Sequence, residues 1–484
     1  MVMLHRLADN KWKRLFLVLA AIALLCAAFV SFARATQNGT EAEEGILSGN
    51  ACSVSDTTAS NGQAVRFGSP TACTAGNPLA GLPLVPWEGG PAYWNQFPKA
   101  VAGGWTDPTF FPILIFYNSF SSESEVQFDK GYGINSYVEG YPDYVDYQWL
   151  QNNGMYWLSS SPNASFPPLT ASAQDSAYWP GIFLDDEPDG RFGSAQNDLD
   201  YVLNTLASNP ENERFRTFNF TQIVAGNYGD SNNTLYTQMI NSYRGPISVD
   251  VYWYTIPNCG PGNPAYDNMI YSPSDPAHCR TSSSYGKTIK SLRQRDAADG
   301  TLKPIWQFIE NLNGGPGEGP FYANITPGQL KGAAMDSIIN EARGLFWFNS
   351  SLTGPCVTGG ALRIVEYDSG ACSKPQMDAM KEVNLLVTSL APVINTQSYQ
   401  YTFGPKLDTM LKWYNGSAYI FAMINGDTDS TAGNRTFVLP AGLASVSSVE
   451  VLNESRSIPV VGGQFTDNFA AEYTYHIYKL TPAP

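Results

Sequence analysis

Histidine, metal-type cysteine spacings and nucleotide-binding motifs are scarce or missing in this sequence. Beyond the N-terminal segment the only histidines are His278 and His476, which argues against a Ser-His-Asp triad and against a His-ligated metal site. The cysteines show no C-x2-C spacing of the kind that zinc sites use. No G-x-G-x-x-G follows an apolar run, and no P-loop is present. The sequence therefore predicts neither a metal nor a cofactor.

Charged residues are also few. They make up 15% of the 484 residues, and the net charge is −15. A net negative charge disfavours nucleic acid and anionic membranes as partners, and it suits a neutral ligand such as a polysaccharide or oligosaccharide. Ser, Thr, Asn, Gly and Tyr must cover much of the surface, as in many extracellular proteins. The hydrophobic share of 43% is enough for a packed interior, and the length suits a large domain with an accessory domain.

The N-terminus resembles a targeting segment. Basic residues at 11–14 precede an apolar run at 15–30, and residues 33–35 read Ala-Arg-Ala. This order is typical of a secretory signal peptide, so we expect cleavage after Ala35 and secretion of the protein. The apolar run is nearly long enough to span a bilayer, which keeps an alternative open. In that alternative residues 1–35 stay attached as a membrane anchor, with the rest of the chain outside the cell.

The remaining cysteines and the sequons agree with an extracellular protein. Six cysteines form three pairs that are close in sequence, which predicts local disulfides, although six cysteines allow about fifteen connectivities. Asn-x-Ser/Thr sequons predict a glycoprotein if the source glycosylates asparagine. The predicted disulfides are Cys52–Cys73, Cys259–Cys279 and Cys356–Cys372. The sequons begin at Asn38, Asn163, Asn219, Asn232, Asn324, Asn349, Asn415, Asn434 and Asn453.

Three kinds of pattern follow one another along the rest of the chain. Residues 36–103 are rich in Gly, Ser, Thr and Pro, which predicts an irregular segment held by the first disulfide. Residues 104–393 alternate strand-like with helix-like runs, as a (β/α)8 TIM barrel does. Residues 394–484 show short alternating runs between Asn-Gly and Gly-Gly turns, which predicts a small antiparallel β-sandwich domain. The eight barrel strands are expected at 112–117, 134–138, 155–159, 181–186, 215–220, 247–254, 304–309 and 344–348.

Two of these expected strands stop abruptly at an acid. The fourth runs Gly-Ile-Phe-Leu-Asp-Asp-Glu-Pro-Asp and reaches Glu187, and the seventh runs Pro-Ile-Trp-Gln-Phe-Ile-Glu-Asn and reaches Glu310. Barrel enzymes place catalytic groups at the C-terminal ends of strands, and two facing carboxylates suffice to cleave a glycosidic bond. Alternation along the strand puts Glu187 on one face with Asp185 and Phe183, and Asp186 on the other.

Here the chain resembles the large clan of (β/α)8 glycoside hydrolases that retain anomeric configuration. In that clan a glutamate ending strand four is the acid/base, and a glutamate ending strand seven is the nucleophile. The resemblance implies that Glu187 donates the proton and that Glu310 attacks the sugar. The clan usually has Asn before the acid/base, whereas this chain has Asp186. Neighbouring acids would raise the pKa of Glu187, and Tyr252 or Tyr254 is expected to hydrogen-bond Glu310.

Aromatic residues near the expected strand ends form a second group of candidates, because flat rings stack on the C–H faces of sugars. Core packing accounts for such rings equally well. Trp347 also resembles the tryptophan that lies beneath the reacting sugar in the clan. Asn118, after the first strand, and Asp250, on the sixth, are further candidates for substrate binding. The aromatic candidates are Tyr137, Trp157, Tyr252, Trp253 and Trp347.

These patterns lead to one hypothesis and three alternatives. The sequence predicts a secreted, monomeric, retaining endo-glycosidase that acts on β-linked polysaccharide. A barrel that binds carbohydrate without cleaving it is the first alternative, favoured by the departure at Asp186. The second is an inverting or substrate-assisted hydrolase that uses Asp185 or Asp189. The third treats the acidic cluster after strand four as a calcium loop or a solvated turn.

Overall fold

The structure is a computed structural model that describes residues 51–55, 63–67, 77–116, 118–138, 147–159, 175–256, 259–262, 264–312 and 324–482. The segment at 1–35 lies outside these residues, so its cleavage or anchoring stays a prediction. The chain forms two units, Met1–Gly76 and Asn77–Pro484. In the first unit, β1 (Ala51–Ser55) and β2 (Gln63–Phe67) pair as an antiparallel hairpin.

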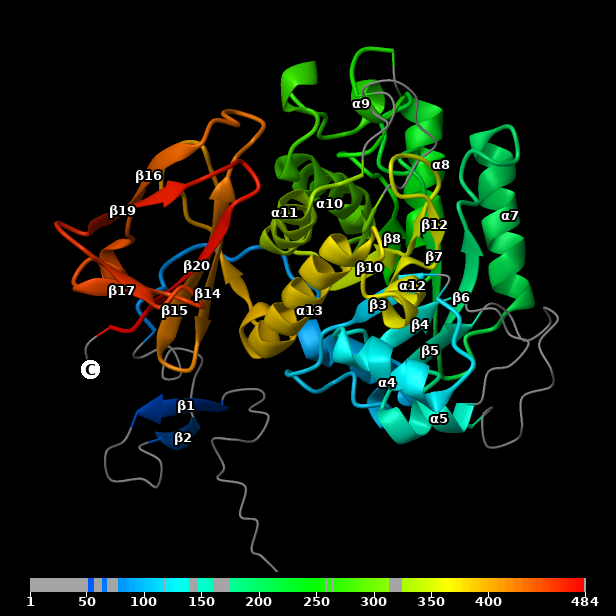
Figure 1. The fold of residues 1–484 in the computed structure, drawn as a ribbon, viewed down its shortest axis with the longest axis horizontal. Helices are drawn as coiled ribbons and strands as arrows, with labels where there is room; N and C mark the ends of the chain where they lie inside the picture. The colour runs from blue at the N-terminus through cyan, green and yellow to red at the C-terminus, as the bar shows by residue number, and fades with distance from the viewer. Residues whose placement is uncertain are drawn as a thin grey trace, which may run out of the picture. The chain divides into compact units, whose positions relative to one another are not determined.

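Eight parallel strands of the second unit close into a barrel, which confirms the predicted (β/α)8 fold (Figure 1). The strands follow one another around the barrel in chain order, and the last pairs with the first. Their runs are apolar on both faces because helices cover the outside and side chains fill the inside. The strands are β3 (Ile113–Phe116), β4 (Ser136–Val138), β5 (Tyr156–Ser159), β6 (Gly181–Asp186), β7 (Phe215–Phe220), β8 (Ile247–Val249), β9 (Ile305–Glu310) and β10 (Gly344–Phe348).

The sixth barrel strand is shorter than the sequence predicts. β8 ends at Val249, whereas the apolar and aromatic run continues to Tyr254. The chain turns at this point, since the N–H groups of Thr255 and Ile256 donate to the carbonyl of Tyr252 at 3.0 and 2.7 Å. Tertiary packing therefore overrides the strand propensity of these aromatic residues.

Helices cover the outside of the barrel (Figure 1). Local signals set where several of them begin: Ser194 caps α7 through the N–H of Asn197, and Thr326 with Gln329 forms a capping box at α11. The longer helices are α4 (Glu123–Gly131), α7 (Ala195–Ser208), α8 (Asp230–Asn241), α10 (Ser282–Asp296), α11 (Pro327–Ile339) and α13 (Lys374–Ile394). Shorter helices are α3 (Pro98–Ala102), α5 (Tyr147–Asn153), α9 (Pro264–Asn268) and α12 (Ala361–Tyr367).

Aromatic rings from the segment before the barrel pack against the starts of its strands. The sequence predicts an irregular segment here, but a 3-10 helix (Gly90–Gln96) and α3 form in it, each with a proline in its first turn. Trp94 lies 5.2 Å from Phe215 between ring centroids, and Trp105 lies 6.3 Å from Trp306. Burial of these rings orders the segment, which composition alone does not reveal.

An antiparallel β-domain follows α13 and matches the predicted sandwich. It consists of a six-stranded sheet and a two-stranded sheet. The alternating sequence signal is weakest in β19, in which polar residues outnumber apolar ones. In sheet order the strands are β13 (Ser398–Tyr399), β14 (Leu407–Tyr414), β15 (Ser417–Ile424), β20 (Tyr475–Leu480), β17 (Ser448–Val451) and β18 (Arg456–Pro459), with β16 (Gly433–Val438) and β19 (Gln464–Phe469) in the second sheet.

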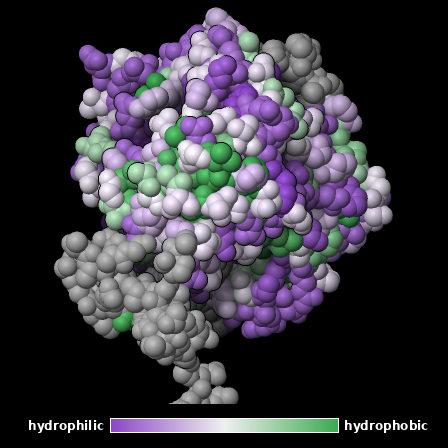
Figure 2. Space-filling model, turned by 90° about the vertical axis from the view of Figure 1, so that its left-hand side faces the viewer, coloured by the Kyte–Doolittle hydropathy of each residue, from purple (hydrophilic) through white to green (hydrophobic). Residues whose placement is uncertain are grey.

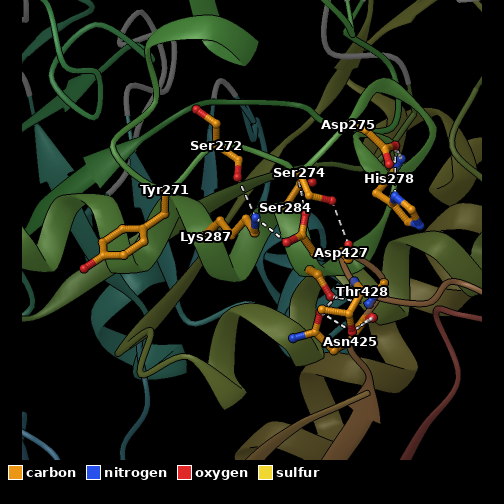
Figure 3. A network of polar contacts seen from close by, with 12 residues as sticks. Tyr271, Ser272, Ser274, Asp275, His278, Ser284, Lys287, Asn425, Asp427 and Thr428 are labelled. Carbon is orange, nitrogen blue, oxygen red and sulfur yellow. Dashed lines mark hydrogen bonds and ion pairs between the residues drawn. The ribbon is translucent and has the colours of Figure 1, made fainter. Parts of the chain in front are cut away.

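Polar contacts join the β-domain to the barrel (Figure 3). Lys287 on α10 forms an ion pair of 2.6 Å with Asp427, in the loop after β15, and donates to the carbonyl of Ser272 at 2.5 Å. The N–H of Ser274 donates to Asp427 at 2.6 Å. The two domains of this unit are thus fixed to each other near the segment that precedes α10.

Two of the three predicted disulfides, Cys259–Cys279 and Cys356–Cys372, are present. Cys73 lies outside the described residues, so its bridge to Cys52 stays a prediction.

No helix among the described residues has the length and apolar character needed to cross a bilayer. Figure 2 views the left-hand side of Figure 1, where the β-domain lies, and shows a patch of hydrophobic residues surrounded by hydrophilic ones.

Candidate active site

A cavity of about 720 Å³ lies where several barrel strands end. Its wall is formed by the C-terminal ends of β3, β6, β8 and β10 and by the segment after β10. This end of a (β/α)8 barrel is the one that carries catalytic residues. The polar and aromatic side chains in the wall include Asn118, Asp186, Glu187, Asp250, Tyr252 and Phe348. The structure thus brings five of the predicted site residues together.

A bulge in β6 decides which of two neighbouring aspartates faces the barrel interior. The register against β7 shifts between Phe183 and Asp185, and a bulge resets the alternation of side chains. Asp186 therefore faces inward and accepts a hydrogen bond of 2.9 Å from Asn219 of β7. Asp185 instead forms a salt bridge with Arg191. This corrects the predicted face, which groups Glu187 with Asp185 and leaves Asp186 on the other side.

Glu187 is the first residue after β6, and it is exposed at the cavity. Its φ is 50°, a left-handed conformation that costs a non-glycine residue roughly 1–2 kcal/mol. The N–H of Glu187 donates to the carbonyl of Asn219 at 2.8 Å. Buried Asp189 accepts from the N–H groups of Thr221 at 2.9 Å and Val224 at 3.2 Å, which holds the turn. The turn therefore presents Glu187 to the cavity.

These contacts correct the alternative in which Asp185 or Asp189 acts on the substrate. Both carboxylates are engaged by protein partners, Asp185 by Arg191 and Asp189 by the loop after β7. Neither lines the cavity. Among the described residues, no group of three or more His, Cys, Asp or Glu side chains is arranged to hold a metal ion, so the calcium-loop alternative gains no support.

Asp250, in the turn after β8, shares a hydrogen bond with Glu187. Its Oδ1 is shielded from solvent and has no hydrogen-bond partner among the described residues. Burial, followed by the negative charges of Glu187 and Asp186, raises the pKa of Asp250 well above its usual range. The raised pKa keeps Asp250 protonated near neutral pH, so Asp250 can donate this hydrogen bond to Glu187.

Glu310, at the end of β9, lies in a different environment from Glu187. Its exposed fraction is 0%, and its carboxylate is not part of the cavity wall. In register it pairs with Phe348, whose ring is in that wall. The end of β9 is therefore close to the cavity while the carboxylate itself is secluded. The sequence predicts that the two glutamates converge on one cleft, and the structure separates them into a solvent-accessible and a buried setting.

The hydrogen-bond donor to Glu310 differs from the predicted one. Tyr285 of α10 donates to both carboxylate oxygens, at 2.6 and 2.7 Å, in place of a tyrosine from the strand-six segment. Burial raises the pKa of Glu310 to about 7, opposed by Tyr285 and by the backbone N–H groups of Tyr254 and Thr255. The sequence contains no periodic signal that links Tyr285 to β9, so this contact follows only from the fold.

A buried aspartate orients Asn118 at the cavity. Asp129 of α4 is wholly buried, and its Oδ2 accepts from Asn118 and Tyr137, both at 2.7 Å, and from Arg363 at 2.5 Å. Asn349 donates to the Oδ1 of Asn118 at 2.8 Å, which fixes the amide from its other side. Burial raises the pKa of Asp129 to about 7 although Arg363 opposes the shift. Sequence reasoning identifies Asn118 but neither Asp129 nor Arg363.

Four predicted aromatic residues lie between strands and helices instead of at the cavity. Trp253 donates its indole N–H to Thr288 of α10, and Trp347 donates to Asn384 of α13, both at 2.9 Å. Tyr137 pairs in register with Trp157, and both are buried. This placement corrects the prediction that these rings stack on sugar. The ring of β10 that does reach the cavity is Phe348, one residue further on.

The aromatic surface of the cavity comes from Phe116, Tyr252 and Phe348, and the ring centroids of the last two lie 5.3 Å apart. Burial and the charges of Asp250, Asp186, Glu310 and Glu187 raise the pKa of Tyr252 well above its usual range, so its phenol stays neutral and can donate. Two further residues escape sequence reasoning, Asn219 and Phe348. A shift of one residue in the assumed inward face would have identified Phe348.

Comparisons with known proteins identify no family for this chain. No protein-family model matches the sequence, and no curated protein is significantly similar to it. A family 51 α-L-arabinofuranosidase from Bifidobacterium longum shares 12% identity at a TM-score of 0.45, over 78% of this chain and 96% of that one. A glycoside hydrolase family 30 subfamily 8 xylanase from Clostridium acetobutylicum shares 14% identity at a TM-score of 0.39, over 76% of this chain and 96% of that one. An Anoxybacillus α-amylase shares 9% identity at a TM-score of 0.39, over 78% of this chain and 99% of that one. Similarity this distant transfers no activity, so the side chains of the cavity have to define the chemistry.

Proposed function

We propose that this protein hydrolyses glycosidic bonds in the cavity at the C-terminal ends of the barrel strands. The observation that carries the proposal is the hydrogen-bonded pair of Glu187 and Asp250, two carboxyl groups that hold one proton at the wall of this cavity. Cleavage of a glycosidic bond needs a carboxylic acid that keeps its proton near neutral pH. A volume of about 720 Å³ is in the range of small-molecule sites and accommodates a sugar ring.

Glu187 is the proton donor in this proposal, since it is the exposed member of the pair. Asp250 keeps a proton available to it through their shared hydrogen bond. Asp186 and Asn118 are fixed by Asn219 and by Asp129, so both present hydrogen-bonding groups of defined orientation to sugar hydroxyls. Orientation of this kind lowers the entropic cost of reaching the transition state.

Glu310 is the nucleophile of a retaining double displacement on a β-linked substrate. Support comes from its place at the end of β9, from its register with Phe348 and from the two hydrogen bonds of Tyr285, which stabilise the ionised form. The carboxylate attacks the anomeric carbon while Glu187 protonates the leaving oxygen, and Glu187 then takes a proton from the attacking water. This role requires the buried carboxylate to reach the sugar when substrate is bound.

The seclusion of Glu310 favours one alternative function, carbohydrate binding without cleavage. A barrel whose second carboxylate never meets the sugar would hold a glycan in the same cavity but would not turn it over. Turnover therefore separates the two functions, and the stereochemistry of the first product identifies the mechanism.

The test combines turnover, stereochemistry and azide rescue. The wild type is incubated with a panel of β-glucans, β-galactans and aryl glycosides, and proton NMR follows the anomer formed first. We expect retention, and we expect azide to rescue Glu310→Ala with formation of a glycosyl azide of inverted configuration. Asp185→Asn, an acid of the same strand that faces away from the cavity, is the control and should stay active. Binding of a glycan without release of any product would overturn the proposal in favour of the alternative.

We further propose that the protein acts outside the cell. The two disulfides of the second unit agree with an oxidising compartment, because cytosolic thiols stay reduced. The targeting segment at 1–35 and the sequons point the same way. Mass spectrometry of the protein purified from its source should find a chain that begins at Thr36, whereas a chain that still carries the apolar run would indicate an anchored form.

A further inference from the structure

The segment that follows β10 forms a wall of the cavity that differs from the strand-end wall. It runs through β11 (Ser350–Ser351) and β12 (Thr358–Gly359) into α12. Leu352 and Ile364, from the hairpin loop and from the helix, line the same cavity as the carboxylates. Ser350 and Arg363 of this segment also line the cavity, and three nitrogens of Arg363 are bonded to protein oxygens. One side of the cavity therefore carries the carboxylates, and the other carries the aliphatic side chains of Leu352 and Ile364.

Large apolar side chains of the same segment are also exposed to solvent. Leu352 is 54% exposed, Val357 62%, Ile364 39% and Tyr367 70%. Twelve large hydrophobic side chains are exposed in the described part of the chain, and these four fall within residues 352–367. Ile364 and Tyr367 lie three residues apart on α12, so they share a side of that helix. A local concentration of exposed apolar surface marks a binding site more often than chance.

A well-connected backbone holds these side chains outward. The N–H groups of Gly360 and Ala361 both donate to the carbonyl of Asn349, and that of Leu362 donates to its side-chain oxygen at 3.0 Å. The disulfide Cys356–Cys372 closes the segment. The backbone that carries the exposed apolar residues is thus held by hydrogen bonds and by a disulfide.

The aliphatic side chains of this wall do not suit a sugar. Leu352 and Ile364 offer no hydrogen bond, and burying sugar hydroxyls against them would leave those hydroxyls unsatisfied. The aromatic residues predicted to line further sugar subsites pack against helices instead. An apolar group attached to the sugar matches the wall, because its transfer out of water is favourable.

We infer that the substrate is a glycoside with an apolar aglycone, an alkyl or aryl group, and that Leu352 and Ile364 receive this group. The inference rests on the proposed function: the sugar occupies the acidic side at Glu187, and the glycosidic oxygen directs the aglycone across the cavity toward the aliphatic side. It replaces the polysaccharide that the sequence predicts with a short glycoside.

Binding of glycosides that resist hydrolysis tests the inference apart from catalysis. Calorimetry compares n-octyl and methyl 1-thio-β-glycosides of glucose, galactose and xylose on the full-length wild type, together with cello- and galacto-oligosaccharides. We expect at least one octyl thioglycoside to bind tenfold or more tightly than its methyl counterpart. The double variant Leu352→Ser/Ile364→Ser should lose this preference and should still bind the methyl compound as the wild type does.

Val438→Ser, an exposed apolar residue of the β-domain, is the matched control and should retain the preference. Equal affinity for octyl and methyl compounds, tighter binding of the oligosaccharides, no binding of any thioglycoside, or an unchanged preference in the double variant would each overturn the inference. Because thioglycosides are not cleaved, a preference can persist even if glycoside hydrolysis is disproved. Thermal unfolding of the double variant checks that it is folded, and Leu352→Ala/Ile364→Ala serves in its place if it is not.

Discussion

Glu187 and Asp250 share a hydrogen bond although they follow β6 and β8, which are separated by β7 in the barrel. The intervening strand contributes Asn219, which binds Asp186 through its side chain and Glu187 through its carbonyl. Three successive strand ends thus position one pair of carboxyl groups. Two groups in contact cannot face each other across a sugar, where a retaining pair needs about 5–5.5 Å. Asp250 therefore acts on Glu187 and leaves the attack to another group.

Replacing Asp250 should shift the pH dependence of activity. In the wild type the pair holds its last proton to high pH, since burial and the neighbouring charges raise the pKa of Asp250. In Asp250→Asn the group with the raised pKa is gone, so the site no longer holds this proton at high pH. We predict that the alkaline limb of kcat/KM moves down by about one pH unit or more. Activity is measured between pH 4 and 9. An alkaline limb at the same pH in both proteins would show that Asp250 does not determine the pH at which the catalytic proton is lost.

The bulge in β6 predicts opposite outcomes for neighbouring aspartates. Asp186→Ala should lower kcat/KM by about 100-fold because it removes an oriented group from the cavity wall. Asp185→Asn should keep kcat/KM within about threefold and cost about 1 kcal/mol of stability, since it loses only the contacts to Arg191 and Tyr201. Steady-state kinetics and urea unfolding check both. The reverse ranking of the two variants would contradict the inward orientation of Asp186.

Asp129 should matter for both stability and substrate binding. Asp129→Ala leaves Arg363 without its buried partner and frees Asn118 and Tyr137, so we expect a loss of about 3 kcal/mol in the free energy of unfolding. Because Asn118 then loses its orientation, KM should rise several-fold more than kcat falls. Glu123→Gln, on the same helix and partly exposed, is the control. A variant with unchanged stability and KM would show that Asp129 neither stabilises the fold nor orients Asn118.

Three buried carboxyl groups predict that the fold is more stable in mild acid than at neutral pH. Burial raises the pKa of Asp129 and Glu310 to about 7 and that of Asp189 to about 6. A raised pKa means that the folded state binds the proton more tightly than the unfolded state does. The resulting contribution to the free energy of unfolding is complete below the pKa of about 4 that these groups have in the unfolded chain, and it is lost as the pH rises through about 6 to 7. Urea unfolding should give a higher free energy at pH 5 than at pH 7, with a smaller difference in Glu310→Gln. A free energy that increases from pH 5 to pH 7 would contradict these shifts.

The sequence predicts where the barrel strands lie much better than which way their side chains point. Apolar runs bounded by turn residues locate all eight barrel strands, because a parallel strand is buried on both faces. The same two-sided burial hides the inward face, so Trp347 is chosen where Phe348 reaches the cavity. The bulge before Asp186 carries no glycine or proline to reveal it. Contacts between distant segments, such as Tyr285 with Glu310, have no local signal at all.

The acidic strand ends, by contrast, are visible in the sequence because a carboxylate closing an apolar run is unusual. Asp186 and Glu187 are found in this way, and Asp250 follows from its place in the next aromatic run. Their meeting at one cavity depends on closure of the barrel, which brings β6 and β8 to the same end.

The release of sugar by the wild type and by Glu187→Gln tests the central claim most directly. Glutamine has nearly the shape of the glutamate and cannot donate the proton to a leaving alkoxide, so we predict a fall in kcat/KM of about 1,000-fold on alkyl glycosides with an unchanged midpoint of thermal unfolding. An aryl glycoside with an acidic leaving group should lose far less, because it leaves without protonation. Equal rates for the two proteins on the alkyl glycosides would contradict the assignment of this cavity as a glycosidase active site.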